Sequence, residues 1–162
     1  MSSDADPGGA GSAGLPRPVG PEPSPPGRTD LSAPGGIERL GGDPPSPSEE
    51  RFDFSRVVRA GRLVLVGGTT SVDVDGAVAG LTPYEQTVEI LRRIQHELGR
   101  VGACLGDVVG TRVYVTDISR GDEVGRAHSE AFSGTRPVMT MVEVSALIDP
   151  RMLVEIEATA FV

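Results

Sequence analysis

The clearest alternation of apolar and polar positions lies in residues 153–162, near the end of the chain. A strand there would place Glu155 and Glu157 together on the face opposite its apolar side chains. An exposed strand face would explain two such carboxylates without any function. A further strand is predicted over residues 138–144, and a turn over 147–150. The apolar face of the last strand would consist of Val154, Ile156, Ala158 and Ala160.

Short strands are predicted before the first helix. The apolar run over residues 57–66 is interrupted by a glycine, which indicates two strands joined by a tight turn. Gly67 and Gly68 follow, so the second strand would end in exposed backbone with little side chain. Residues 72–78 contain an Asp-Gly pair, which is a strong signal for a hairpin turn.

Two helices are predicted, with a strand between them. The first would begin at a capping box formed by Thr82 and Glu85 and end at Gly99 or Gly102. The second would span residues 119–132. Between them, residues 108–116 alternate as a strand does. One face of that strand would carry Val109, Thr111, Val113 and Val115.

This order of elements predicts an α+β fold of two layers, in which two helices cover one face of a mixed sheet. The other face would remain uncovered, and it would be too apolar for open water. We therefore expect an oligomer that closes the uncovered faces against each other. That face is expected to carry Arg112, Tyr114, Glu155 and either Met139 or Met141.

The composition changes near residue 50. Eleven of the 14 prolines and ten of the 22 glycines lie in residues 1–50. Such a segment buries too little apolar surface to offset its ordering entropy, so we expect a disordered tail over 1–50 and a folded domain over 51–162. Two hypotheses remain for the tail. The proline-rich stretch at 21–26 docks to a partner as polyproline II, or the tail has no specific role.

Composition and charge exclude several classes of function. The 162 residues carry a formal net charge of −8, which disfavours binding to nucleic acid. There is no lysine, so lysine Schiff bases and phosphate-binding P-loops are excluded. One cysteine, Cys104, and two histidines do not suit a zinc site, and we expect no metal or other cofactor. No run of about 18 apolar residues and no signal peptide is found, so we expect a cytoplasmic protein without a membrane span.

The C-terminal pattern resembles the signature of a known family. Residues 137–144 read Pro-x-x-Thr-x-Val-Glu-Val, and residues 154–158 read Val-Glu-Ile-Glu-Ala. This order is similar to the signature of the RidA/YjgF family of reactive-intermediate deaminases, Pro-Ala-Arg-Ser-x-Val-Glu-Val followed by Glu-Ile-Glu-Ala. The resemblance implies a chorismate-mutase-like domain that forms a homotrimer, with a ligand cleft at each subunit interface.

The resemblance also implies site residues. Glu155 corresponds to the carboxylate that positions a catalytic water, and Met139 stands where the family has its catalytic arginine. The chain therefore resembles a divergent member of the family. Arg126 has two interpretations, as a cation supplied across the subunit interface or as a plain surface arginine. The positions that the resemblance assigns to substrate binding are Phe54, Gly67, Gly68, Arg126, Met139 and Thr140.

Two classes of function remain open. In the family, arginine clamps the substrate carboxylate through paired hydrogen bonds, whereas Met139 is apolar and suits a hydrophobic ligand. One hypothesis is an enzyme that hydrolyses an imine or enamine, or another hydrolase or tautomerase of specialised metabolism, with water activated by Glu155. The other is a non-catalytic protein that binds an apolar or weakly anionic metabolite in the same cleft.

Overall fold

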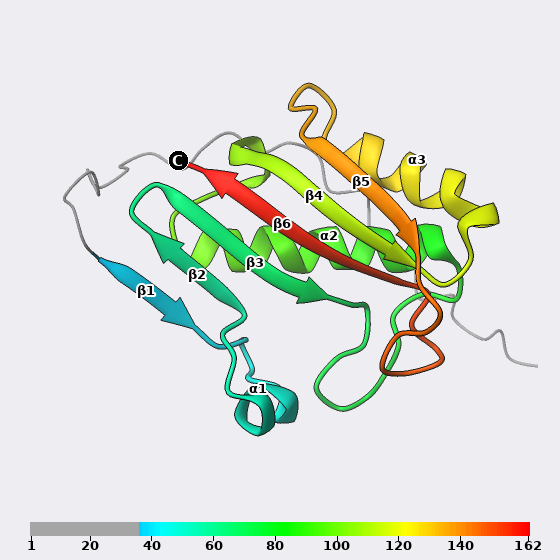
Figure 1. Ribbon diagram of the computed structural model, residues 1–162, viewed down its shortest axis with the longest axis horizontal. Coiled ribbons are helices and arrows are strands. Elements are labelled where there is room, and N and C mark those ends of the chain that lie inside the picture. The colour runs from blue at the N-terminus through cyan, green and yellow to red at the C-terminus, as the bar shows by residue number, and fades with distance from the viewer. Residues whose placement is uncertain (1–35) are drawn as a thin grey trace, which may run out of the picture.

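The computed structural model describes residues 36–162, which form one sheet packed against two long helices (Figure 1). Two one-turn 3₁₀ helices, Leu105–Asp107 and Ile118–Arg120, precede β4 and α3. The strands are β1 (Ile37–Leu40), β2 (Val57–Ala60), β3 (Leu63–Thr69), β4 (Val108–Val115), β5 (Val138–Glu143) and β6 (Val154–Phe161). The helices are α1 (Pro47–Phe52), α2 (Pro83–Arg100) and α3 (Gly121–Ala131).

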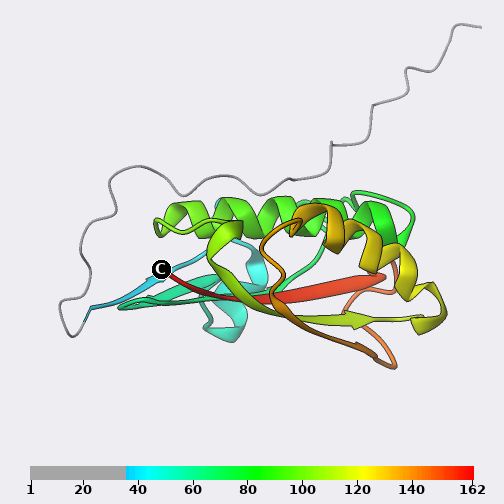
Figure 2. The same ribbon diagram turned by 90° about the horizontal axis from the view of Figure 1, so that it is seen from above.

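The six strands are arranged in the order β1-β2-β3-β6-β4-β5. β4 and β5 run parallel, and the other neighbouring pairs are antiparallel. α2 and α3 lie side by side on one face of this sheet, as Figure 2 shows. The predicted two-layer α+β architecture with a mixed sheet is therefore confirmed.

The helix α2 forms where the sequence predicted it. The Thr82 hydroxyl oxygen accepts a hydrogen bond from the backbone N–H of Glu85, and the Glu85 carboxylate accepts one from the backbone N–H of Thr82, so the capping box is present. One side of the helix is fully buried against the sheet, because its apolar residues recur every three or four positions. The buried apolar residues of α2 include Val88, Ile90, Leu91, Ile94 and Leu98.

The alternation along β6 is also confirmed, and it separates two environments. The predicted apolar set, Val154, Ile156, Ala158 and Ala160, is buried beneath the helices, each at 3% exposure or less. Neither α2 nor α3 covers the opposite face of the sheet (Figure 2). Large apolar side chains remain exposed on that face, which we call the open face: Leu63, Leu65, Val138, Val142 and Phe161.

The expectation that Met139 or Met141 lies on the open face is wrong. Met139 is paired with Thr111 and Met141 with Val113, and both partners are buried on the helix side of β4. Side chains of paired residues share a face, so both methionines point toward α3. A Cβ at Gly121, the first residue of α3, would lie 3.1 Å from the sulfur of Met141.

Val109 was predicted to share a face with Thr111, Val113 and Val115, and this is wrong as well. The register between β4 and β6 shifts between Val108 and Gly110, so β4 carries an irregularity there. Val108 is consequently buried at 2% exposure, whereas Val109 is 50% exposed. From Thr111 onward the alternation follows the prediction, because the shift adds one residue and then ends.

The predicted boundary at residue 50 is wrong, since ordered structure begins earlier. β1 pairs with β2 along its whole length, with Ile37 opposite Ala60 and Leu40 opposite Val57. The segment between β1 and α1 is also held in place, because Glu49 accepts a hydrogen bond of 2.6 Å from the Gly42 backbone. The proline-rich stretch at 21–26 lies outside the described residues, so its hypotheses stay open.

Candidate functional site

Glu155 and Gly68 are in close contact on the open face. A Cβ at Gly68 would lie 2.0 Å from Oε1 of Glu155, which is far inside van der Waals distance. The glycine therefore allows the carboxyl group to lie directly against the backbone of β3. Two of the residues that the sequence assigned to the site are brought together in this way.

The environment of Glu155 raises the pKa of its carboxyl group above the ordinary value. Burial is the largest cause, the nearby carboxylate of Glu157 adds to it, and the cation of Arg56 opposes both. Within residues 36–162 the Glu155 carboxyl group makes no hydrogen bond, although its side chain is half-buried. A carboxyl group with a raised pKa and free oxygens is suited to accept a proton and return it, as a general base does.

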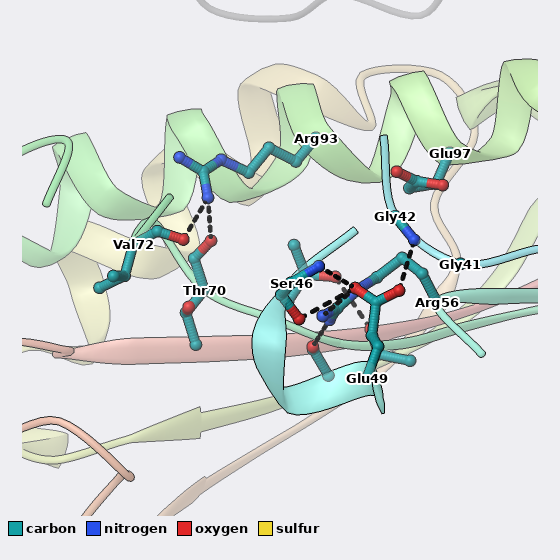
Figure 3. A network of polar contacts seen from close by, with 12 residues as sticks. Gly41, Gly42, Ser46, Glu49, Arg56, Thr70, Val72, Arg93 and Glu97 are labelled. Atoms are coloured by element: carbon teal, nitrogen blue, oxygen red, sulfur yellow. Dashed lines mark hydrogen bonds and ion pairs between the residues drawn. The ribbon is translucent and has the colours of Figure 1, made fainter. Parts of the chain in front are cut away.

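Arg56 is a site residue that the sequence analysis missed. Its guanidinium donates a hydrogen bond of 2.6 Å to the carbonyl of Gly68 and one of 3.3 Å to Oε1 of Glu49 (Figure 3). It also lies over the ring of Phe54, at 5.3 Å from the centroid. A lone arginine ahead of a strand carries no pattern of its own, so only its contacts in the fold reveal the role.

Glu157, the neighbouring carboxylate on the same face, is occupied by structural contacts. The Tyr114 hydroxyl donates to it at 3.2 Å, and Arg112 lies 3.4 Å from its other oxygen. Glu143 is likewise occupied, because it accepts a hydrogen bond of 2.9 Å from the backbone of Ile118. Of these three carboxylates, Glu155 is the one whose oxygens remain free for a ligand or water.

Gly67, Phe54 and Thr140 take different places around this centre. The Gly67 backbone N–H donates 2.9 Å to the carbonyl of Arg56 and is used by the fold. Phe54 is 41% exposed and presents its ring beside Arg56. Thr140 is paired with Arg112 on the open face and is exposed. Thr140 therefore shares a face with Glu155, whereas Met139 does not.

Met139 borders a separate cavity of about 360 Å³ between α3 and β5, on the helix side of the sheet. The methionine is 40% exposed, so part of its side chain is free to contact a ligand. The cavity contains several apolar and aromatic groups and no carboxylate. Its lining residues are His128, Ser129, Phe132, Ser133, Gly134, Arg136, Pro137 and Met139.

His128 forms the buried floor of this cavity. Its Nε2 atom lies 2.9 Å from Oγ1 of Thr111, and its ring packs against Phe132 with 4.5 Å between the centroids. Burial lowers the pKa of His128 below the ordinary value, so the ring is neutral at physiological pH. The cavity thus has an aromatic wall with one neutral, hydrogen-bonding imidazole.

Arg126 lies apart from both groups within one subunit. It is exposed on α3, and its guanidinium stacks over the ring of Tyr84 at 4.1 Å from the centroid. Tyr84 in turn donates a hydrogen bond of 2.7 Å to Glu130. Both partners belong to the outer surface of the two helices, which agrees with the interpretation of Arg126 as a surface arginine.

No group of three or more potential metal-ligating side chains occurs within residues 36–162. The same part of the chain contains no helix with the length and hydrophobicity needed to cross a lipid bilayer.

The comparisons with known proteins agree on one family. Residues 47–162 match the family model described as endoribonuclease L-PSP. An uncharacterized protein of Streptomyces coelicolor is 40% identical over 116 residues, which cover 72% of this chain and 87% of that protein. A RutC family protein of Pyrococcus abyssi is 32% identical over 110 residues, which cover 67% of this chain and 85% of that protein.

A solved structure supports the same assignment. It is that of a Mycobacterium tuberculosis protein described as a member of the highly conserved YjgF/YER057c/UK114 family. The two chains are 49% identical, and their structures match with a TM-score of 0.71 over 78% of this chain and 100% of the other. The matches in sequence and in structure show together that the chain belongs to the RidA/YjgF family.

Proposed function

We propose that this protein binds a small metabolite in clefts between the subunits of a homotrimer and hydrolyses an imine or enamine there. The observation that carries the proposal is the Glu155 carboxyl group, which lies against Gly68 with a raised pKa and no hydrogen bond from the described residues. Such a group is available to activate a water molecule.

The trimer is inferred from the two faces of the sheet. Exposed apolar side chains on the open face, such as Leu65 and Phe161, would be buried by association with a second copy. Association also offers a way to unite the two halves of the site. The Glu155 group of one subunit and the Met139 cavity of its neighbour would then line a single cleft.

The chemistry follows from the carboxyl group. Glu155 takes a proton from water while the water oxygen bonds to the imine carbon, and the former double-bond electrons move to nitrogen. Glu155 returns the proton it took from water to the nitrogen, which gives a carbinolamine. A second proton then passes from the carbinolamine hydroxyl to the nitrogen, and the carbon–nitrogen bond breaks as the carbonyl forms. The products are a carbonyl compound and ammonia, and the water supplies the oxygen, so atoms and electrons balance. The residues around Glu155 hold the substrate and exclude bulk water.

The test uses imines produced in place from a series of amino acids by an amino-acid oxidase, with the release of ammonia as the readout. We expect the wild-type protein to accelerate hydrolysis of at least one bulky imine. Glu155→Gln should reduce that rate by about 10²–10⁴-fold while leaving ligand binding intact. Glu143→Gln is the matched control, because its carboxylate accepts a hydrogen bond from the backbone of Ile118 and is not among the charges that shift the pKa of Glu155. Equal rates for wild type and Glu155→Gln would refute the catalytic role.

The trimer has a test of its own. Light scattering of the purified protein should give three times the chain mass at micromolar concentration. Leu65→Glu would place a charge on the open face and should shift the protein toward monomer. A stable, well-behaved wild-type monomer would remove the shared cleft from the proposal.

A second candidate is a binding protein without turnover, and the specific observation in its favour is Met139 in the cavity. A methionine cannot form the paired charged hydrogen bonds that an arginine makes with a carboxylate. Binding of a metabolite that is unaffected by Glu155→Gln, with no turnover of any imine, would favour this candidate. The net charge of −8 disfavours binding of RNA, which is the substrate that the name of the family model implies.

A further inference from the structure

A second cavity, of about 360 Å³, is lined by α2, by the loop that follows β3 and by the segment 41–46 that connects β1 to α1. We call it the β1–α1 cavity. The connecting segment precedes the residues that match the family model, so this cavity is built partly from residues outside the matched domain. Figure 3 shows the region, with the carboxylate of Glu97 on α2 facing the chain at Gly41 and Gly42.

Arg100 joins two walls of the β1–α1 cavity. Its Nη1 atom donates a hydrogen bond of 2.6 Å to Oε2 of Glu97 and another of 2.6 Å to the carbonyl of Gly41. The side chain of Glu97 therefore lies next to the connecting segment. Asp43, two residues beyond Gly41, lines the same cavity, so two carboxylates from different elements face one space.

The guanidinium groups around this cavity are already paired. Arg56 is bonded to Glu49 at 3.3 Å, and Arg92 and Arg93 each donate to Glu89 at 2.7 Å. Arg93 also donates to three backbone carbonyls of the loop after β3, and Figure 3 shows two of these bonds. A phosphate or carboxylate ligand would have to displace these partners, so the cavity does not suit an anion.

Two carboxylates at the cavity keep oxygens that have no donor. Glu97 is only 7% exposed, and its Oε1 atom makes no hydrogen bond with any of residues 36–162. The exposed carboxylate of Asp43 makes none with that part of the chain either. A nearly buried carboxylate oxygen without a donor costs free energy, so a ligand that brings N–H donors would stabilise it.

The charges favour a cation as that donor. The lining contains carboxylates at positions 43, 49, 73 and 97 but guanidinium groups at only three, so negative charge is in excess. Within residues 36–162 no three side chains are placed to ligate a metal ion, so an organic cation fits better. An ammonium group carries one positive charge and three N–H donors, which match two carboxylates with free oxygens.

We propose that the β1–α1 cavity binds a small aliphatic amine in its ammonium form. Glu97 and Asp43 accept the N–H hydrogen bonds, and the alkyl chain packs against Pro44 and Val74, which also line the cavity. Hydrogen bonds between a charged donor and a carboxylate are the strong class, and the low exposure of Glu97 strengthens the attraction. Glu155 does not line this cavity, so the inference is independent of imine hydrolysis.

The experiment is an NMR titration of the isotope-labelled, full-length protein with butylamine and, separately, with butan-1-ol. The alcohol has the same alkyl chain and an uncharged hydroxyl group. Wild type should bind the amine at least about tenfold more tightly than the alcohol, because hydrogen bonds between charged groups contribute more. The amide signals that shift should belong mainly to residues 41–46, 69–74 and 92–97, which surround the cavity.

Two substitutions test the carboxylates. Glu97→Gln should weaken binding of the amine by about 10- to 100-fold and leave binding of the alcohol nearly unchanged. Asp43→Asn alters an exposed side chain that has no partner in residues 36–162, so the protein should fold normally. Its binding of the amine should weaken by at least about fivefold, and this variant decides the question if Glu97→Gln does not fold.

The control is Glu50→Gln, because Glu50 is exposed on α1 and does not line the cavity. It should leave the affinity for the amine unchanged. Equal affinity of wild type for amine and alcohol would overturn the inference and indicate that water alone satisfies Glu97. Wild-type affinity in either folded carboxylate variant would also overturn it, as would signal shifts confined to residues away from the cavity.

Discussion

Met139 and Glu155 project from opposite faces of the same sheet. On β4, Thr111 is the partner of Met139 and Tyr114 is the partner of Glu155, and positions 111 and 114 face opposite ways. Thr111 bonds to His128 beneath α3, whereas Glu155 lies against Gly68 on the open face. Within one subunit these two residues cannot contact the same small molecule, which is why the proposed cleft needs two copies of the chain.

The contact between Gly68 and Glu155 predicts the effect of a single methyl group. Gly68→Ala would place a Cβ 2.0 Å from the carboxylate oxygen, so the flexible Glu155 side chain must move. The cost in unfolding free energy should be below about 2 kcal/mol, because the obstructing atom ends a mobile side chain. Imine hydrolysis should fall with the displacement. A double-mutant cycle with Glu155→Ala checks this, since the cost of the methyl group should vanish once the carboxyl group is gone.

The raised pKa of Glu155 predicts a gain in stability when its charge is removed. Because the pKa of Glu155 is higher in the folded state than in the unfolded state, ionisation of the carboxyl group costs more in the folded protein. The contribution of the neutral group to stability is therefore present below the unfolded pKa and is lost as pH rises through the folded pKa. Glu155→Gln should therefore raise the melting temperature at pH 7, by an amount on the order of 1–3 °C. The difference should disappear below the ordinary value of 4.5, where the carboxyl group is neutral in both states. A lower melting temperature at pH 7 would contradict the burial argument.

His128 predicts a loss of stability in mild acid. Its folded pKa is lowered, so its contribution to stability is present above the ordinary value of 6.5 and is lost as pH falls below it. Chemical denaturation at several pH values should show the decline starting near that value. His128→Gln should flatten this part of the curve. His96→Gln is the control, because His96 is exposed on α2, and it should leave the slope unchanged.

Met139 predicts weak activity on small substrates. The wild type should hydrolyse the imine derived from 2-aminoacrylate slowly or not at all, since the methyl side chain of that imine fills little of the cavity. Met139→Arg should increase affinity for small carboxylates, because it adds a second cation beside Arg136. Parallel assays of wild type and Met139→Arg on small and bulky imines check this. Fast hydrolysis of the small imine by wild type would contradict our interpretation of Met139.

The ordered segment before the family domain predicts a stability difference between two truncations. The chain starting at residue 36 retains β1 and the Glu49 contacts, whereas the chain starting at residue 47 loses β1 and the Gly42 hydrogen bond. The longer protein should melt several degrees above the shorter one, as expected for losing a paired strand. Equal melting temperatures would show that β1 adds no stability to the sheet.

Local patterns were sufficient to predict most elements. The capping box at Thr82, the helical spacing along α2 and the alternation along β6 depend on neighbouring residues only, and all three are present in the structure. A close contact at Gly68 could also be expected, because a glycine at the end of a strand lets a ligand or another side chain lie directly against the backbone. The fold class follows from the order of these elements.

The early strand and the shift in β4 could not be predicted from local patterns. Residues 37–40 are surrounded by proline and glycine, and they form β1 only because β2 offers an edge for pairing. The irregularity at Val109 reverses one position of the alternation. Gly110, a glycine inside the strand, often accompanies such irregularities, but the residue types do not tell which position is shifted.

The two groups of the candidate site were decided by tertiary structure. The sequence by itself determined that Glu155 occupies the polar face of its strand and that Met139 lies on the strand before it. It did not determine which face of the sheet Met139 occupies, because that depends on the register between β4 and β5, two strands joined through α3. A shift of one residue would exchange the faces, and the observed register places Met139 beside His128 and Arg136 and away from Glu155.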